Sequence, residues 1–225
     1  MYKPRLAVLL SGDGSNLQAL IDATQNGILK AEIVLVVSNK VDAGGLKRAQ
    51  SSGIENIVVD NLQYPDRRSF DCVLESKLKK YNLDLIILAG FMRILTSDFV
   101  KAFAGRIINI HPSLLPKYRG LHTHQQALDA GDKIAGATVH FVTSELDGGP
   151  SIIQAVIPVL KNDTVDVLAR RILVKEHQIY PLAVKLFCEG RLSLTDEKAV
   201  FDSVILPKNG LRFNNELMKL EQDIC

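Results

Sequence analysis

The stretch RLAVLLSGDGSNLQALIDATQNG, residues 5–27, joins an apolar run to a short glycine-bearing loop and a segment with apolar residues at helical spacing. A run that is apolar throughout is typical of a strand buried on both faces of a parallel sheet. Leu17, Leu20 and Ile21 lie on one side of an amphipathic helix that Gly27 is placed to end. The stretch therefore predicts a strand, a tight turn and a helix.

The same alternation continues through the first half of the chain. Predicted strands are AEIVLVVS (31–38), ENIVVD (55–60), LDLIILAG (83–90) and GRIINI (105–110), and predicted helices are DAGGLKRAQSSG (42–53), DRRSFDCVLESKLKKY (66–81) and TSDFVKAF (96–103). Strands that alternate with helices favour an α/β fold with an open, mostly parallel, Rossmann-like sheet and helices on both faces. After Gly131, IAGATVHFV (134–142) and SIIQAVIPV (151–159) read as an antiparallel strand pair, followed by a helix over about 163–189.

Composition narrows the class of protein. The chain has 225 residues, is 47% hydrophobic and has a net charge of +2, from 27 basic and 25 acidic side chains. This near balance gives no electrostatic case for nucleic acid or an anionic membrane. Three widely spaced cysteines suggest a reducing compartment, and the longest N-terminal apolar run, LAVLL, is too short for a signal peptide. We expect a cytoplasmic protein with small-molecule substrates, without nucleic-acid or membrane partners, as a monomer or a homodimer.

The loop SGDGSN, residues 11–16, lies between the first strand and the first helix. Glycines let the backbone approach an anion, and the free N–H groups of a helix N-terminus face it. The dinucleotide fingerprint is incomplete because Leu17 stands at its third glycine position, so a monophosphate suits the loop better. A tight turn that binds nothing is the alternative, and Asp13 fits an anion site only if its side chain points away.

Two further polar stretches interrupt the apolar pattern. In NIHPSLLP, residues 109–116, Asn109 and His111 face the same side of an extended strand, and Pro112 ends its ladder. ELDGGP, residues 145–150, places Asp147 before two glycines, which by itself is typical of an ordinary turn. His122 and His124 lack the further ligands of a metal site, so no metal is predicted.

These residues lead to a known family. The segments SGDGSNLQALID, VVSNK, LAGFMRIL, GRIINIHPSLLPKYRGLHTHQQAL, GATVHFVTSELDGGPSIIQA and EHQIYPL resemble phosphoribosylglycinamide formyltransferases over roughly residues 5–190. NIHPSLLP alone is shared with other formyl-folate enzymes, whereas GLHTH favours the glycinamide branch. Asp13, where the family often has Asn, and Arg119, which resembles the tRNA-modifying relatives, are departures. The resemblance implies one formyltransferase domain over 1–205, with a phosphate-binding half (about 1–105), a catalytic and folate half (about 106–190), and a tail of unknown role (206–225).

The resemblance implies formyl transfer from 10-formyltetrahydrofolate, a co-substrate, to the amine of glycinamide ribonucleotide, without a metal. Asn109 and a protonated His111 would stabilise the oxyanion, and Asp147 would partner His111 because a carboxylate favours the charged ring. It also implies that Gly12, Asp13, Gly14, Ser15, Asn16 and Glu176 bind the ribonucleotide, and that Arg67, Met92, Arg93, Ile94, Leu95 and Asn109 bind the folate.

Two alternatives remain at this point. One is another formyl-folate enzyme, either methionyl-tRNA formyltransferase, which normally carries a further basic C-terminal domain, or formyltetrahydrofolate hydrolase, which normally has a preceding regulatory domain. The other is an inactive phosphate- or folate-binding module, against which the joint presence of Asn109, His111 and Asp147 argues. Whether His111 or a water held by Asp147 moves the proton is open.

Overall fold

The computed structural model describes residues 2–214 and 219–221, and the chain divides into two compact units, 1–109 and 110–225. The division falls within strand β5 (Ile107–His111). The first unit contains a parallel sheet in the order β5-β4-β1-β2-β3. Its other strands are β1 (Arg5–Leu10), β2 (Glu32–Ser38), β3 (Asn56–Val58) and β4 (Leu85–Leu88).

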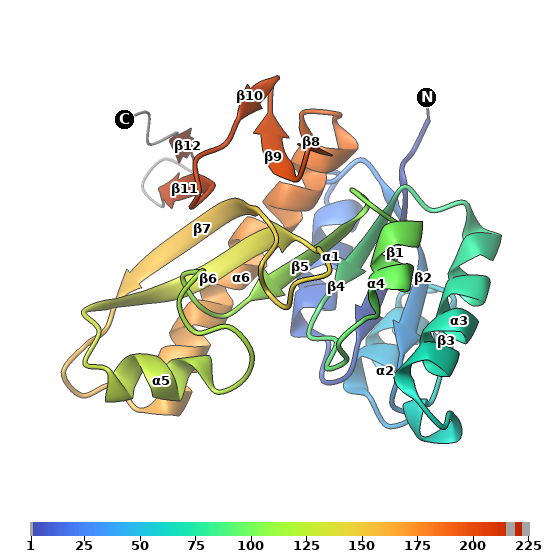
Figure 1. Cartoon of the computed structure of the whole chain (residues 1–225), viewed down its shortest axis with the longest axis horizontal. Coiled ribbons are helices and arrows are strands. Elements are labelled where there is room, and N and C mark those ends of the chain that lie inside the picture. The colour runs from blue at the N-terminus through green and yellow to red at the C-terminus, as the bar shows by residue number, and fades with distance from the viewer. Residues whose placement is uncertain (1, 215–218, 222–225) are drawn as a thin grey trace. The chain divides into compact units, whose positions relative to one another are not determined.

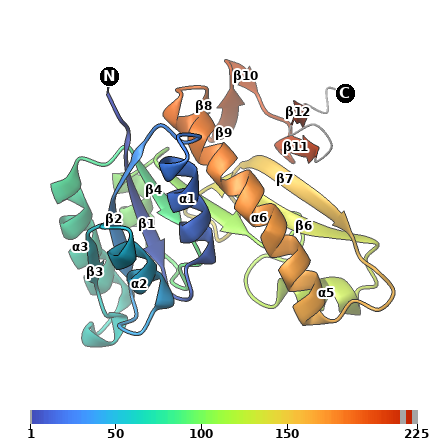
Figure 2. The same ribbon diagram turned by 180° about the vertical axis from the view of Figure 1, so that it is seen from behind.

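Helices cover both faces of this sheet, as predicted. Helices α1 and α2 lie on one face and α3 and α4 on the other (Figures 1 and 2). Successive crossovers lead from β1 outward to β3 and then back to β4 and β5 on the other side of β1. Because crossovers between parallel strands are right-handed in nearly all proteins, such a reversal places the later helices on the opposite face. The helices of this unit are α1 (Ser15–Gln25), α2 (Gly44–Ser51), α3 (Arg67–Leu78) and α4 (Ser97–Ala102), with short 3₁₀ turns η1 (Asn61–Gln63) and η2 (Lys79–Tyr81).

Local chemistry explains where several of these helices begin. Asp66 accepts a hydrogen bond from the Ser69 N–H at the start of α3, and Thr96 caps α4 by accepting from Phe99 N–H. Gly14 precedes α1 in the left-handed conformation, with φ of 78°. A Cβ atom there would lie 2.6 Å from Cα of Gly45, so both its φ and its surroundings favour glycine.

The second unit is built on the predicted antiparallel pair, β6 (Ile134–Phe141) and β7 (Ser151–Pro158). The long helix α6 (Val165–Cys188) packs against both strands and contacts the short helix α5 (Thr123–Asp129). A separate antiparallel sheet in the order β10-β9-β8 follows α6. Its strands are β8 (Leu192–Thr195), β9 (Lys198–Phe201) and β10 (Val204–Ile205).

The segment after residue 205 contributes to this unit, which the sequence did not predict. Strand β11 (Leu211–Asn214) pairs in parallel with β7, and β12 (Lys219–Glu221) pairs antiparallel with β11. Leu211 is fully buried, and Phe213 is nearly so. Strand β11 therefore extends the sheet edge at β7, and Leu211 and Phe213 belong to the hydrophobic core.

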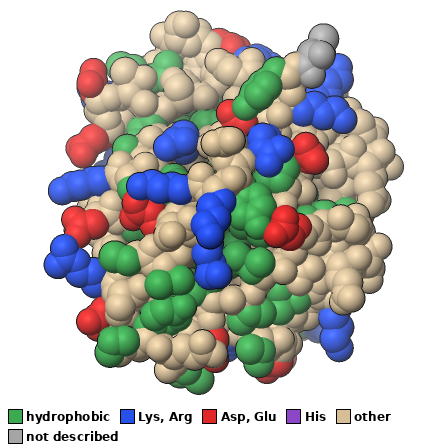
Figure 3. Space-filling model, turned by 90° about the vertical axis from the view of Figure 1, so that its right-hand side faces the viewer, with side chains coloured by type: hydrophobic (Ala, Val, Ile, Leu, Met, Phe, Trp, Pro, Cys, Tyr) green, Lys and Arg blue, Asp and Glu red, His purple; other side chains and the backbone are tan. Residues whose placement is uncertain are grey.

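Surface properties agree with the near-neutral composition. On the face that Figure 3 shows, lysine and arginine side chains are interspersed with acidic ones and with hydrophobic groups, and neither sign of charge dominates. Among the described residues, no helix combines the length and the apolar character that crossing a membrane requires.

Candidate active site

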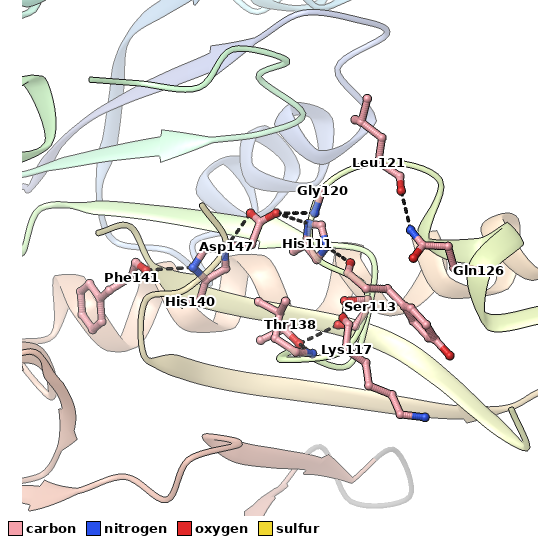
Figure 4. A network of polar contacts seen from close by, with 12 residues as sticks. His111, Ser113, Lys117, Gly120, Leu121, Gln126, Thr138, His140, Phe141 and Asp147 are labelled. Carbon is pink, nitrogen blue, oxygen red and sulfur yellow. Dashed lines mark hydrogen bonds and ion pairs between the residues drawn. The ribbon is translucent and has the colours of Figure 1, made fainter. Parts of the chain in front are cut away.

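His111 ends strand β5 and is almost completely buried. Its Nε2 atom lies 2.8 Å from the main-chain carbonyl oxygen of Tyr118 (Figure 4). A carbonyl oxygen accepts but does not donate, so this hydrogen bond requires a proton on Nε2. In neutral His111 the bare nitrogen is therefore Nδ1, and Nδ1 is the atom at which the ring gains its second proton.

Asp147 faces that second nitrogen. Its Oδ2 atom lies 3.5 Å from Nδ1 of His111 and accepts a hydrogen bond of 2.9 Å from the Gly120 N–H. The side chains of His111 and Asp147 are 7% and 9% exposed. Because a charge-assisted N–H···O bond is usually about 2.7–2.9 Å long, a proton on Nδ1 would be attracted by Asp147 without being fully engaged by it. The two residues that the sequence linked only through the family resemblance thus lie side by side.

The loop that carries Asp147 depends on its glycines. Asp147 is itself in the left-handed region, with φ of 47°. A Cβ atom on Gly149 would lie 1.9 Å from the carbonyl oxygen of Phe141, which forms part of β6. The absence of a side chain at Gly149 therefore lets the loop approach the backbone at the end of β6.

A second histidine, His140 on β6, lies on the other side of Asp147. Its Nε2 atom is 3.8 Å from Oδ1 of Asp147, and its Nδ1 atom is 2.8 Å from the carbonyl oxygen of Phe141. Burial lowers the pKa of His140 to about 4, although the Phe141 carbonyl and the Asp147 carboxylate act in the opposite direction. His140 is therefore a neutral neighbour of Asp147 at pH 7 (Figure 4).

The segment between His111 and α5 contacts both His111 and Asp147. We call Pro112–Gly120 the strap. Its first part is fixed by buried polar side chains of the strand pair: Thr138 Oγ1 donates to the Ser113 carbonyl (2.7 Å) and accepts from the Leu115 N–H (3.1 Å). Gln154 Nε2 donates to the Leu115 carbonyl (2.8 Å). Through these hydrogen bonds, β6 and β7 hold the first part of the strap in place.

Two hollows flank the strap. A cavity of about 300 Å³ is lined by Asp147, Arg119 and the segment Glu197–Ala199, among others. Another, of about 270 Å³, is lined by Tyr118, α5 and the strand pair. Leu115 and Pro116 line both, so the strap separates the two spaces.

The loop expected to bind phosphate lies in the first unit. Gly12 and Gly14 lie in the turn between β1 and α1, and Ser15 and Asn16 begin α1. A Cβ atom on Gly12 would meet nothing within 4 Å. Asp13 is turned toward Arg48, whose Nη2 atom lies 2.8 Å from its Oδ2 atom. The Asp13 carboxylate is therefore paired with a cation of α2.

The segment expected to bind folate follows β4 and is tied to the same turn. The Ser11 N–H donates to the Gly90 carbonyl (3.1 Å), and the Met92 N–H donates to Ser11 Oγ (2.7 Å). Met92 and Ile94 are 64% and 47% exposed, whereas Leu95 is buried. The segment thus combines exposed apolar side chains with a fixed backbone.

Arg67 and Arg93, the two cations of the expected folate site, both act on Asp71, a buried carboxylate in α3. Burial raises the pKa of Asp71, while its hydrogen bond from the Thr96 N–H (2.6 Å) and the two arginines oppose that rise. Arg93 also lies over the ring of Phe70, at 5.4 Å from its centroid. This cluster links α3 to the segment that contains Met92–Leu95.

The remaining predicted residues lie on regular elements. Asn109 is half-buried on β5 opposite Leu88 of β4, and Glu176 is a buried residue of α6. Within residues 2–214 and 219–221, no cluster of three or more His, Cys, Asp or Glu side chains is arranged to hold a metal ion. Sequence reasoning missed His140, Thr138 and Gln154 as neighbours of the site. The signal available for the first two was a polar residue at every second position of an otherwise apolar strand.

Comparison with known proteins shows the family of the chain. Residues 4–184 match the family model described as formyl transferase. The chain is 48% identical over 205 residues to the phosphoribosylglycinamide formyltransferase of Escherichia coli K12, covering 91% of this chain and 97% of that protein. The structure of the phosphoribosylglycinamide formyltransferase from Coxiella burnetii, 45% identical, superposes with a TM-score of 0.91 over 95% of this chain and 100% of that chain.

The fold and the residues around Asp147 thus define a one-carbon group transferase, and the chain belongs to the formyl transferase family. Within that family it is similar to the glycinamide ribonucleotide branch: glycinamide ribonucleotide transformylase 1 from Symbiobacterium toebii is 47% identical, with a TM-score of 0.86 over 88% of this chain and 94% of that chain.

Proposed function

We propose that this chain transfers the formyl group of 10-formyltetrahydrofolate to the amine of 5-phosphoribosylglycinamide. The products are formylglycinamide ribonucleotide and tetrahydrofolate, and the step belongs to de novo purine biosynthesis. The observation that supports this best is the buried pair of His111 and Asp147 in a chain that matches phosphoribosylglycinamide formyltransferases along nearly their whole length. The same match favours this reaction over those of the other formyl-folate enzymes and over an inactive binding module.

The proposed chemistry follows from the needs of the intermediate. The amine attacks the formyl carbon and forms a tetrahedral centre whose oxygen becomes negative, and collapse of that centre breaks the bond to folate N10. In our proposal the Asn109 amide and protonated His111 stabilise that oxygen. Asp147 keeps the ring charged and oriented. One proton moves from the attacking amine to folate N10, so the reaction needs no external acid.

The same proposal assigns the binding groups. Gly12–Asn16 hold the ribonucleotide phosphate through main-chain N–H groups, with Glu176 toward its ribose side. Met92–Leu95 and Asn109 contact the folate, and Arg67 faces its glutamate carboxylates. No metal is required, because the formyl donor is already activated, and a cytoplasmic monomer or homodimer remains our expectation for the state of the protein.

A direct assay tests the function. The protein is mixed with 10-formyltetrahydrofolate and glycinamide ribonucleotide, and the folate product is followed by absorbance. We expect turnover that a chelator does not change, and loss of turnover in His111→Ala. Formylation of methionyl-tRNA, or release of formate without an acceptor, would instead identify one of the other formyl-folate activities. Absence of turnover together with ligand binding would identify a binding module.

A further inference from the structure

The strap contacts both members of the central pair. The Tyr118 carbonyl accepts from Nε2 of His111 (2.8 Å), and the N–H of Gly120, two positions along, donates to Asp147 Oδ2 (2.9 Å). A displacement of Tyr118 would therefore change two things together: which nitrogen of His111 carries the proton, and where the Asp147 carboxylate points. The position of Tyr118 thus has direct consequences for the chemistry proposed above.

The part of the strap that contains Tyr118 is not held by the strand pair as its first part is. Tyr118 is in the left-handed region with φ of 55°, which is uncommon for a bulky residue and needs support from its surroundings. The two cavities flank the strap, so close packing on both sides does not supply all of that support. Within the strap, the Ser113 hydroxyl donates to the Lys117 carbonyl (2.6 Å), and further polar contacts come from outside it.

Asp132, in the turn before β6, provides such contacts. Its Oδ2 atom accepts from the Tyr118 hydroxyl (2.8 Å), and its two oxygens accept from Lys117 Nζ (2.8 and 3.0 Å). The hydrogen bonds from Lys117 and Tyr118 lower the pKa of Asp132, so the acceptor is charged at neutral pH. At the far end, Arg119 forms an ion pair with Glu145 of the loop that carries Asp147.

We propose that Tyr118 and Asp132 form a positioning pair, in which the hydroxyl–carboxylate bond holds the Tyr118 carbonyl on His111 so that the ring keeps its proton on Nε2 and presents Nδ1 to Asp147. Neither residue needs to touch substrate in this role. The inference deepens the proposed function and rests on it, because it requires that His111 and Asp147 act in the formyl transfer.

The test compares Tyr118→Phe, which deletes one hydroxyl, with Tyr81→Phe as a matched control. Tyr81 also donates its hydroxyl to a carboxylate, Glu55 Oε1 at 2.5 Å, but it lies in the first unit at η2. We expect Tyr118→Phe to lower kcat about tenfold while each KM stays within about twofold, since small misplacements of reacting groups affect the chemical step. Tyr81→Phe should leave both parameters unchanged.

Asp132→Ala should lower kcat at least as much as Tyr118→Phe, because it removes the acceptor of the Tyr118 hydroxyl and also the two hydrogen bonds from Lys117. The double variant should be no slower than Asp132→Ala, because the hydroxyl has no acceptor left to lose. Asp132→Asn keeps an oxygen acceptor for the hydroxyl and should retain more activity than Asp132→Ala. A separate readout is the ¹⁵N spectrum of the His111 ring in the free protein. Neutral His111 should carry its proton on Nε2 in the wild type, and Tyr118→Phe should increase the Nδ1–H form.

The outcomes separate the two proposals. If His111→Ala is inactive but Tyr118→Phe and Asp132→Ala keep the wild-type kcat, the positioning pair is wrong and the proposed function stands. If the wild-type ring is found with its proton on Nδ1, the positioning pair is also wrong, whatever the kinetics. If His111→Ala keeps full activity, the assigned site fails and the inference fails with it.

Discussion

The Nδ1 atom of His111 lies 3.5 Å from Oδ2 of Asp147, and the opposite nitrogen of the same ring is engaged by the Tyr118 carbonyl. Both ring nitrogens therefore face protein atoms, and the ring orientation is set from both sides. The family resemblance by itself implied only that Asp147 is the partner of His111. The structure identifies which nitrogen faces the acid, and the first prediction concerns that nitrogen.

Asp147→Asn keeps the size of the side chain and an acceptor for the Gly120 N–H but removes the charge that favours a protonated Nδ1. We expect kcat to fall roughly 10²–10³-fold, the usual effect of losing one oxyanion donor, with little change in either KM. Steady-state kinetics check this. Asp129→Asn, at an exposed aspartate that accepts from Gln125, is the control. His111→Ala and Asp147→Asn should be strongly non-additive; independent multiplicative losses would show that Asp147 serves another purpose.

Gly12 and Gly14 should respond differently to substitution. A side chain on Gly12 has free space, so Gly12→Val should leave the melting temperature unchanged and weaken ribonucleotide binding by blocking close approach of the phosphate. Gly14→Ala places a Cβ atom 2.6 Å from Gly45 Cα in a left-handed backbone, and it should destabilise the protein by at least about 1–2 kcal/mol. Calorimetric titration with each ligand and thermal unfolding distinguish the two effects. Equal losses of folate and ribonucleotide affinity in Gly12→Val would contradict the assignment of this loop.

The burial of His140 predicts how stability depends on pH. Its pKa is about 4 in the folded chain and about 6.5 when exposed, so between these values the unfolded chain binds more protons. The contribution of this residue to the free energy of unfolding is complete above pH 6.5 and is lost as the pH falls toward 4, by an amount on the order of 3 kcal/mol.

Urea unfolding of the wild type, His140→Gln and the control His122→Gln at pH 7 and pH 5 measures this effect. His122 is exposed, so its replacement should leave the pH dependence unchanged. His140→Gln should show a smaller loss of stability between the two pH values than the wild type. Equal losses in all three proteins would mean that His140 is not buried in its neutral form.

The described part of the C-terminal segment should contribute to stability. Leu211 of β11 is fully buried against β7, so Leu211→Ala should lower the free energy of unfolding by about 2–5 kcal/mol. Leu62→Ala is the matched control, because Leu62 is 86% exposed. Chemical denaturation of both variants checks the difference. If the two variants are equally stable, β11 does not pack as the structure shows.

Much of the fold was predictable from local patterns. The apolar runs RLAVLL and LIIL became the fully or almost fully buried strands β1 and β4, because a run without polar residues has to be covered on both faces. Thr96 was expected to begin a helix, and it caps α4. The tail was not predicted, since β11 is a short strand and its burial depends on a partner strand far away in the sequence.

For the candidate site too, some features follow from the local sequence and others only from tertiary packing. The sequence by itself determined the types of chemical group: an amide and an imidazole at a strand end, glycines in two loops, and an acid before one glycine pair. The residue types at these positions reflect backbone conformation and side-chain chemistry, which act over a few neighbouring positions. Only the tertiary structure decided that Asp147 lies between His111 and His140. It also decided that the Tyr118 carbonyl faces Nε2 of His111 and so favours a proton on that nitrogen. These relationships depend on strand register and loop path, which are set by packing between segments that are distant in the chain.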